Sequence, residues 1–517
     1  MAVLVCGLAA PRFRVAPPVL LLACGALLGF ATALRQVHLP PEVVLLLFLP
    51  ALLYWESITT SLREIRSNLR TIVLLSTGLV IATAAAVAAV AHALGLDWGP
   101  AWVLGAAVAP TDATAVSALA RMLPRRTITV LRAESLVNDG TALVIYALAV
   151  GITRGQEHFG MLHVTGLFLL AYGGGAVAGA VTAWLAVQVR RRLDDPLQAN
   201  VAIIVTPFTA FLLAEAIHAS GVLAVVVCGL IMSQAGPRVG QAETRQQTQA
   251  FWSLATFLLN GALFVLVGLE LQVAVHGLTS DALTQGLIAV IAVSATVVGA
   301  RFAWLFTTPY LVRLLDRRPQ QRLRRVGARS RVVSATAGFR GAVSLAAALA
   351  VPETVASGAP FPGRDVIIFV TAGVIVVTLV VQGLLLPVVV RWARLPRDTS
   401  VQAERHFAEI LATEEALTAI PQLADGLGTD PEVSGRLHRE YEKHLRLLRA
   451  GDAGADDEPA LRYDQQYTAL RLAVLAHKRA TVLRLRDERR IDDIVLRQIQ
   501  ARLDIEEVRL SRRETAD

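Results

Sequence analysis

Three clusters of polar and ionisable residues lie inside long apolar stretches of this 517-residue chain. The first is the segment 109–114, Ala-Pro-Thr-Asp-Ala-Thr, where Pro110 lacks a backbone N–H and disfavours helix at the residue before it. We expect the helix to unwind there, and unwound backbone at membrane depth persists only where it lines a cavity or is buried in protein. Freed carbonyl oxygens beside Asp112 would form a cation site. The alternative is a proline kink in which Asp112 caps the second half-helix.

The second cluster, residues 134–139, opens the next apolar stretch. Ser135, Asn138 and Asp139 are spaced three and four residues apart, so they share one face of a helix. The Asp139 carboxylate is both a hard oxygen ligand and a proton acceptor, so sodium and a proton would compete for it. The alternative is an acid-rich helix N-terminus favoured by the helix dipole.

The third cluster, residues 336–342, places Arg340 between two glycines. Glycines weaken a helix, and an arginine inside a membrane keeps its charge and needs an anionic partner. By elimination we expect that partner to be Glu134, because Asp112 and Asp139 are needed for the ion. The alternative is that Arg340 extends to the cytoplasmic surface.

Three further ionisable residues, Glu56, Glu215 and Arg301, also lie well inside apolar stretches. An ionisable group in hydrocarbon is costly, so each is a candidate functional residue. Glu56 follows the apolar run 48–55 and could serve as a further ligand or gate, or as an anchor at the cytoplasmic end of its helix.

The composition divides the chain into two parts. Residues 1–397 hold 30 Arg and 17 acidic residues, whereas residues 398–517 hold 19 basic and 24 acidic residues. Apolar runs of about 20 residues recur through the first part, and each can span a bilayer as a helix. A soluble enzyme and a porin-type barrel are therefore excluded. We expect a membrane domain over 1–397 and a cytoplasmic helical tail, regulatory or dimerising, over 398–517.

The arginines predict the topology. Alternate loops hold 25 Arg in total, whereas the loops between them hold only Arg35, Arg154 and Arg364. Cytoplasmic loops are enriched in Lys and Arg, so the arginine-rich loops and the tail should face the cytoplasm. Counting residues 1–10 as the end of a first span gives about 13 spans. We therefore predict a multi-pass protein of the inner (plasma) membrane. The net charge of +8 reflects this topology, and we expect no nucleic-acid partner.

The interrupted segments occupy matching positions. Pro110 falls in the fifth of spans one to six, and Arg340 falls in the fifth of spans eight to thirteen. Two six-span halves joined by one span must have opposite orientations. Interrupted helices at matching places in inverted halves are typical of the binding site of a secondary transporter. The expected fold is all-α, with two inverted six-span repeats and crossed broken helices.

These segments together resemble the sodium/proton exchanger family, on the monovalent cation:proton antiporter branch of NhaP-type antiporters and NHE exchangers. The resemblance rests on residues 48–56, 109–112, 134–139, 214–221, 264–269 and 338–341. It implies that Asp139 is the carrier carboxylate and that Asp112, Thr111 and Ser135 help to hold Na+. It places Glu134 and Arg340 as a structural ion pair and Glu56 where some members have another ligand. It further implies a homodimer and, through Asn138, electroneutral exchange.

The expected function is exchange of Na+, with Li+ as a second candidate cation, for H+ by alternating access, in pH and sodium homeostasis. Na+ and H+ would be transported substrates, and no cofactor is expected. The oxygen ligands would also suit K+/H+ exchange. A channel or sensor is a less favoured class, which electrical recording would distinguish. The chain shows no HExxH motif and no hydrolytic carboxylate pair, so we do not expect an enzyme.

Overall fold

The computed structural model describes residues 1–13, 17–31, 41–112, 123–155, 161–239, 241–276, 280–315, 327–396, 398–452, 459–488, 490 and 492–514. These residues are almost entirely helical, and the β pairing among them is one isolated bridge between Thr354 and Pro360. The chain forms two compact units, Met1–Asp398 and Thr399–Asp517. Each unit is described by itself.

The first unit is built from apolar helices, as expected from its hydropathy. Seven helices among the described residues are long and apolar enough to cross a membrane, and four shorter apolar helices accompany them. An all-helical fold with apolar candidate membrane spans is therefore confirmed, while the count of about 13 spans stays a prediction. The helices before the second cluster are α1 Ala2–Phe13, α2 Pro17–Leu28, α4 Pro41–Thr59, α5 Leu62–Val73, η1 Leu74–Leu79, α6 Val80–Ala93 and α7 Trp98–Val108.

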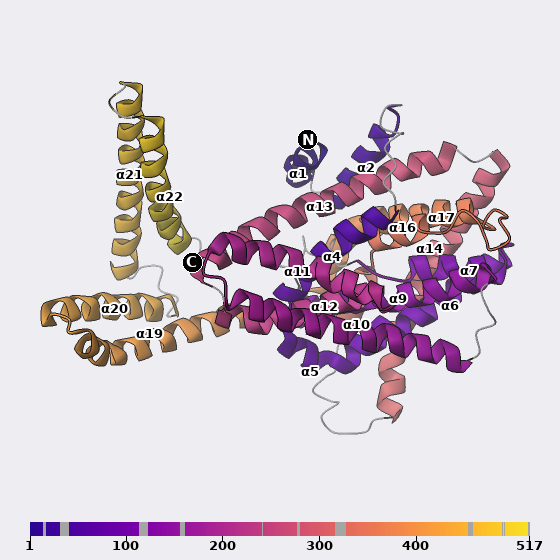
Figure 1. The fold of residues 1–517 in the computed structure, drawn as a ribbon, viewed down its shortest axis with the longest axis horizontal. Coiled ribbons are helices and arrows are strands. Elements are labelled where there is room, and N and C mark those ends of the chain that lie inside the picture. Colours follow the sequence, from indigo (N-terminus) through magenta and orange to yellow (C-terminus); the bar gives the residue numbers. More distant parts are fainter. Residues whose placement is uncertain are drawn as a thin grey trace. The chain divides into compact units, whose positions relative to one another are not determined.

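The rest of this unit, from residue 123 onward, is also helical. Its elements are α9 Arg125–Thr153, α10 Met161–Arg190, α11 Pro196–Ala216, α12 Gly221–Val239, α13 Ala242–His276, α14 Ser280–Leu315, α15 Ala328–Thr336, α16 Ala342–Leu349, α17 Arg364–Val377, η4 Thr378–Gln382 and α18 Gly383–Ala393. Figure 1 shows most of these helices lying along one another.

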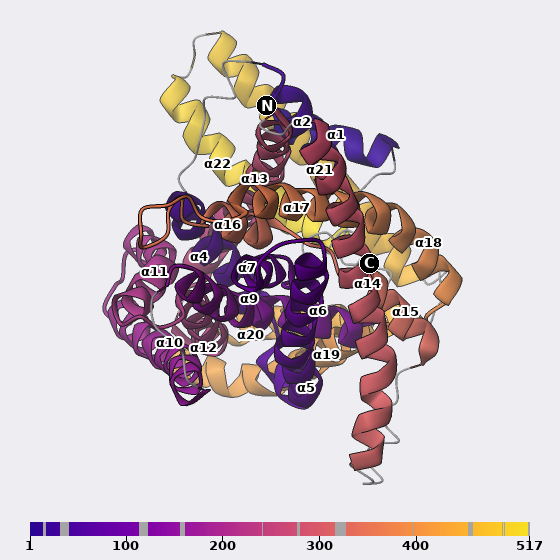
Figure 2. The same cartoon turned by 90° about the vertical axis from the view of Figure 1, so that its right-hand side faces the viewer.

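The helices of the first unit pack as two groups. One group contains α2, α4, α10, α11, α12 and α13, and the other contains α6, α7, α9, α14, α15, α16, α17 and α18. Figure 2 shows α10, α11 and α12 together on one side of α7 and α9. One apolar core around Tyr54 and Val225 lies mainly in the first group, and one around Leu104 and Val374 lies in the second. A third core joins Leu22 of α2 and Phe264 of α13 to residues of α15, α17 and α18. The groups meet where α4 contacts α9 and α16, where α12 contacts α9, and where α13 contacts α16 and α17.

Small residues allow the closest helix approach within the first group. A Cβ added to Gly268 of α13 would overlap the backbone of α2, and a Cβ on Gly25 of α2 would overlap Val265. Close backbone packing at small residues is the usual way in which membrane helices associate.

The second unit contains four amphipathic helices, α19 Ser400–Leu427, α20 Pro431–Asp452, α21 Pro459–Asp487 and α22 Asp493–Glu514. The sequence predicts helical runs at 401–421, 432–450, 460–488 and 491–512, and all four are present. Consecutive helices pair, α19 with α20 and α21 with α22. Leu472 and Leu475 of α21 pack on Leu503 and Leu510 of α22. The tail is therefore a folded helical unit.

Candidate cation site

The first helix break forms as Pro110 predicts. Helix α7 ends at Val108, and residues 109–112 are non-helical. Ala109 and Thr111 are buried, so this backbone is enclosed by protein. The rest of the expected helix, residues 113–120, lies outside the described residues.

The second break surrounds Arg340. Helix α15 ends at Thr336, and α16 begins at Ala342 after a non-helical stretch. Gly341 has extended dihedral angles, φ −135° and ψ −157°, which other residues can adopt. Glycine is needed here for a different reason, because an added Cβ would overlap the Asp112 carboxylate.

The two breaks touch. The backbone N–H of Asp112 donates to the Phe339 carbonyl oxygen at 2.9 Å. Nη1 of Arg340 donates to the carbonyl oxygens of Ala109 at 2.7 Å and Pro110 at 2.9 Å. These two carbonyls were expected to face a cation, but the guanidinium already binds them. Arg340 thus stabilises the unwound backbone of the other break.

The predicted ion pair between Glu134 and Arg340 is wrong, because Glu134 pairs with a different arginine. Glu134 of α9 is 1% exposed and binds Arg301 of α14, which is 2% exposed. The pair is bidentate: Nη1 binds Oε1, and Nη2 donates to Oε2 at 3.1 Å. Nε of Arg301 donates to the Ser334 carbonyl at 3.1 Å. The elimination failed because two buried arginines were available, and helix packing places Arg301 against this carboxylate.

The same carboxylate connects to the first break. The Thr111 hydroxyl donates to Oε1 of Glu134 at 3.3 Å. Nδ2 of Asn138 donates to the Thr111 hydroxyl at 2.7 Å. Asn138, which the sequence groups with the cation ligands, therefore holds Thr111 in place and does not line the pocket described next.

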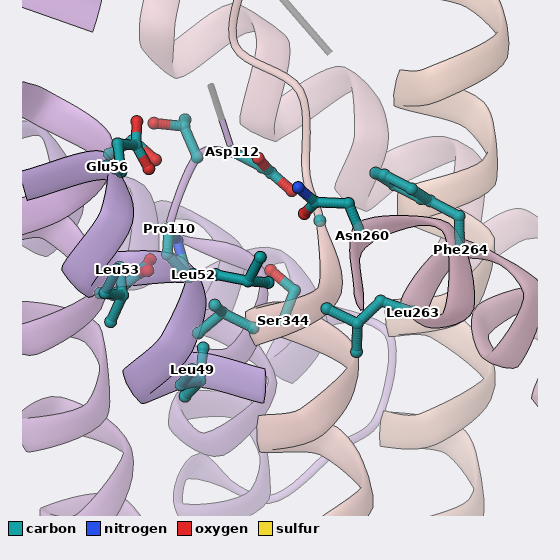
Figure 3. Close-up of a pocket in the computed structure, with 15 residues that line it drawn as sticks. Leu49, Leu52, Leu53, Glu56, Pro110, Asp112, Asn260, Leu263, Phe264 and Ser344 are labelled. Atoms are coloured by element: carbon teal, nitrogen blue, oxygen red, sulfur yellow. The ribbon is translucent and has the colours of Figure 1, made fainter. Parts of the chain in front are cut away.

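A pocket lies where the two helix groups meet, and Asp139 is 4% exposed in its wall. Figure 3 shows Glu56, Asp112 and Asn260 around one end of this pocket, with leucines of α4 at the other. The pocket is lined by Leu49, Leu52, Leu53, Glu56, Pro110, Thr111, Asp112, Ser135, Asp139, Asn260, Leu263, Phe264, Gly341, Val343 and Ser344. Five of the six predicted ion-site residues line it.

The pocket combines three carboxylates, Glu56, Asp112 and Asp139, with hydroxyl groups. Among the described residues no group of three or more His, Cys, Asp or Glu is placed to hold a metal ion together. Carboxylate and hydroxyl oxygens suit a hard monovalent cation, and the carboxylates can also take a proton. Asp112 lies at the N-terminus of α16, where the helix dipole favours a negative charge.

Two polar residues of the pocket wall, both on helices that follow the carboxylates in the sequence, were not predicted from the sequence. Asn260 of α13 and Ser344 of α16 line the pocket. Both are uncharged, and single uncharged polar residues are too common in membrane helices to be singled out. The available signal was an asparagine, Asn260, within an apolar run and a serine, Ser344, just after the Gly-Phe-Arg-Gly break.

Known proteins resemble the chain across most of its length. The family model for the transmembrane part of sodium/hydrogen exchangers matches residues 1–392. An uncharacterized Na+/H+ exchanger of Mycobacterium tuberculosis is 48% identical over 501 residues, covering 96% of this chain and 92% of the relative. The Na+/H+ antiporter ApNhaP of Aphanothece halophytica is 30% identical over 425 residues, covering 81% of this chain and 78% of the relative.

The fold also matches a solved structure. The sodium proton antiporter MjNhaP1 from Methanocaldococcus jannaschii at pH 8 aligns with a TM-score of 0.58 and 18% identity, covering 75% of this chain and 96% of that one. This likeness concerns the fold. Because the family model matches most of the chain, and a 48% identical relative is covered almost completely, the chain belongs to the sodium/hydrogen exchanger family.

Proposed function

We propose that this protein exchanges a monovalent cation, Na+ first, for H+ across the plasma membrane. The observation that carries the proposal is the position of Asp139, a buried carboxylate in a pocket between two groups of membrane helices. Membership of the sodium/hydrogen exchanger family supports the same activity. Asp139 would hold the cation and the proton in turn.

The cation would be held by Asp139 and Asp112, with oxygen atoms of Thr111 and Ser135. All four residues line the pocket. Glu56 adds a third carboxylate from α4, which supports its reading as a further ligand or gate. The Glu134–Arg301 pair and Asn138 would act indirectly, by fixing the helix break that carries Thr111.

Alternating access would move one helix group against the other. The pocket receives α4 and α13 from one group and α9, α16 and the first break from the other, so relative motion would change which side it opens to. A bare buried carboxylate is costly. Each crossing would therefore need Asp139 neutralised by a cation or a proton, and this requirement couples the two fluxes.

The remaining expectations belong to the same proposal. Thirteen spans in two inverted repeats, a homodimer and a cytoplasmic tail would complete the transporter, and pH and sodium homeostasis would be its role. The contact between the two breaks supports the crossed arrangement, because Asp112 and Phe339 come from corresponding places in the proposed halves.

The deciding experiment measures cation-driven proton flux in proteoliposomes, with Na+, Li+ and K+ titrated separately. Asp139→Asn keeps the shape of the side chain but removes its charge, and we expect it to abolish exchange with every cation. Asp365→Asn removes an exposed carboxylate at the start of α17, outside the pocket, and should exchange normally. Undiminished exchange by Asp139→Asn would refute the proposal.

The cation series also separates the alternatives. Exchange driven by K+ but not by Na+ would identify the K+/H+ antiporter. A sustained current far above carrier turnover in electrical recording would indicate a channel. An absence of flux with all three cations would leave the sensor class.

A further inference from the structure

Ser344 has a buried hydroxyl whose hydrogen-bonding capacity is unused. It is the third residue of α16 and is 1% exposed. Among the described residues its Oγ has no hydrogen-bond partner. A buried polar atom without a partner costs free energy, so a ligand that supplied the missing contact would be stabilised there. The Ser344 hydroxyl lines the same pocket as Asp112 and Asp139, which makes the cargo of the pocket its natural partner.

Asn260 approaches the pocket from the opposite helix group. It lies on α13, one turn before Phe264, in the otherwise apolar wall formed with Leu263. Figure 3 shows Asn260 near the labelled Asp112, with Ser344 below both. An amide supplies one neutral oxygen acceptor with two lone pairs. The pocket thus receives uncharged oxygen atoms from α13 and α16. Neither helix carries one of the pocket carboxylates.

We propose that Ser344 and Asn260 are cation ligands that determine which alkali cation the protein carries. This inference rests on the proposed exchange function and deepens it. The carboxylates supply the charge that every monovalent cation needs, so they discriminate weakly among cations. A small cation loses more hydration free energy on binding than a large one, and the number and field strength of the neutral oxygen ligands decide how much of that loss is offset. Na+ and Li+ should therefore depend on these two oxygens more than K+ does.

The test compares cation affinities of purified, reconstituted variants. In Ser344→Ala the apparent KM for Na+ and Li+ should rise about tenfold, the size expected for losing one well-placed polar contact, and that for K+ should change less. Ser344→Cys fills the same space with a soft sulfur atom and should behave like Ser344→Ala. Asn260→Ala should shift the same ratio. The double variant should be non-additive, because both residues bind one ion.

Ser294 provides a matched control. It is also a buried serine whose Oγ has no partner among the described residues, but it lies on α14 and does not line the pocket. Ser294→Ala should leave the Na+/K+ preference unchanged. A second readout is binding without transport: Na+ should raise the thermal midpoint of wild type and Ser294→Ala more than that of Ser344→Ala.

The outcomes distinguish this inference from the function itself. If wild type exchanges Na+ for H+ but Ser344→Ala and Asn260→Ala keep its Na+/K+ ratio, the ligand assignment is overturned while exchange stands. Restoration of wild-type selectivity by Ser344→Cys would overturn it as well, since the side chain would then act through packing. If wild type exchanges no alkali cation, the proposed function fails first.

Discussion

The backbone N–H of Asp112 donates a 2.9 Å hydrogen bond to the carbonyl oxygen of Phe339. This bond joins two helix interruptions that are more than 200 residues apart in the sequence. Arg340 strengthens the junction through the Ala109 and Pro110 carbonyls. Backbone groups that the interruptions expose are thus satisfied across the junction, as burial without water requires. Geometry at one break therefore controls geometry at the other.

Gly341→Ala should abolish or severely reduce exchange. The added Cβ would overlap the Asp112 carboxylate and displace it or separate the breaks. The measurement is Na+-driven proton flux in proteoliposomes, normalised to folded protein from size-exclusion chromatography. Gly299→Ala is the control, because a Cβ there meets nothing within 4 Å. Wild-type flux from Gly341→Ala would show that the close approach to Asp112 is not required.

The ion pair between Glu134 and Arg301 should appear in a double-mutant cycle. Breaking a buried pair strands a charge and costs about 3–5 kcal/mol, so Glu134→Gln and Arg301→Gln should each lower thermal stability strongly. The double variant should lose much less than the sum. The same cycle with Arg340→Gln should show weaker coupling, because Arg340 donates to backbone carbonyls. Stronger coupling of Glu134 to Arg340 than to Arg301 would contradict the structure.

Tyr172→Phe should destabilise the contact between the helix groups. The Tyr172 hydroxyl of α10 is hydrogen-bonded to Thr141 of α9, two residues beyond Asp139. Thr141 is fully buried, so losing this partner should cost about 1–3 kcal/mol, read as a lower thermal midpoint in detergent. Tyr146→Phe is the control, because the buried Tyr146 hydroxyl has no partner among the described residues. If Tyr172→Phe and Tyr146→Phe lowered the thermal midpoint equally, the hydrogen bond between Tyr172 and Thr141 would not be what stabilises this contact.

Lowering the pH should weaken apparent Na+ affinity without reducing the maximum rate to the same extent. Protons and Na+ compete for Asp139 in the proposed mechanism, so acid raises the apparent KM for Na+. At pH values where Asp139 is mostly protonated, the apparent KM should rise about tenfold for each unit that the pH falls. Initial rates over a grid of Na+ concentrations and pH values check this. An apparent KM that stays constant while the rate falls would argue against a shared carboxylate.

Exchange should be insensitive to membrane potential. Asn138, and not a second carboxylate, precedes Asp139, and the resemblance to the electroneutral branch of the family implies that one cation would be exchanged for one proton. Imposing potentials of either sign with valinomycin and potassium gradients, while Na+ drives proton flux, should leave initial rates unchanged. A clear voltage dependence would reject one-for-one stoichiometry and leave the antiport proposal in place.

Much of the site followed from local chemistry. Proline at 110 and the glycines around Arg340 predicted both helix breaks, because missing donors and missing side chains weaken a helix wherever they occur. The apolar runs predicted membrane helices, and the charge-rich tail yielded four amphipathic helices near their expected bounds. Asp139 could be selected because a carboxylate is conspicuous within an apolar segment.

The tertiary structure decided which of these groups meet. Glu134 and Arg301 are 167 residues apart, and only the packing of α9 against neighbouring helices selects Arg301 over Arg340. Packing likewise turned Asn138 towards Thr111 and brought Ser344 and Asn260 into the pocket. Hydropathy and backbone chemistry are properties of a few adjacent residues, so the sequence determined them by itself. Partnership between distant side chains depends on how helices cross, and this was settled only by the fold.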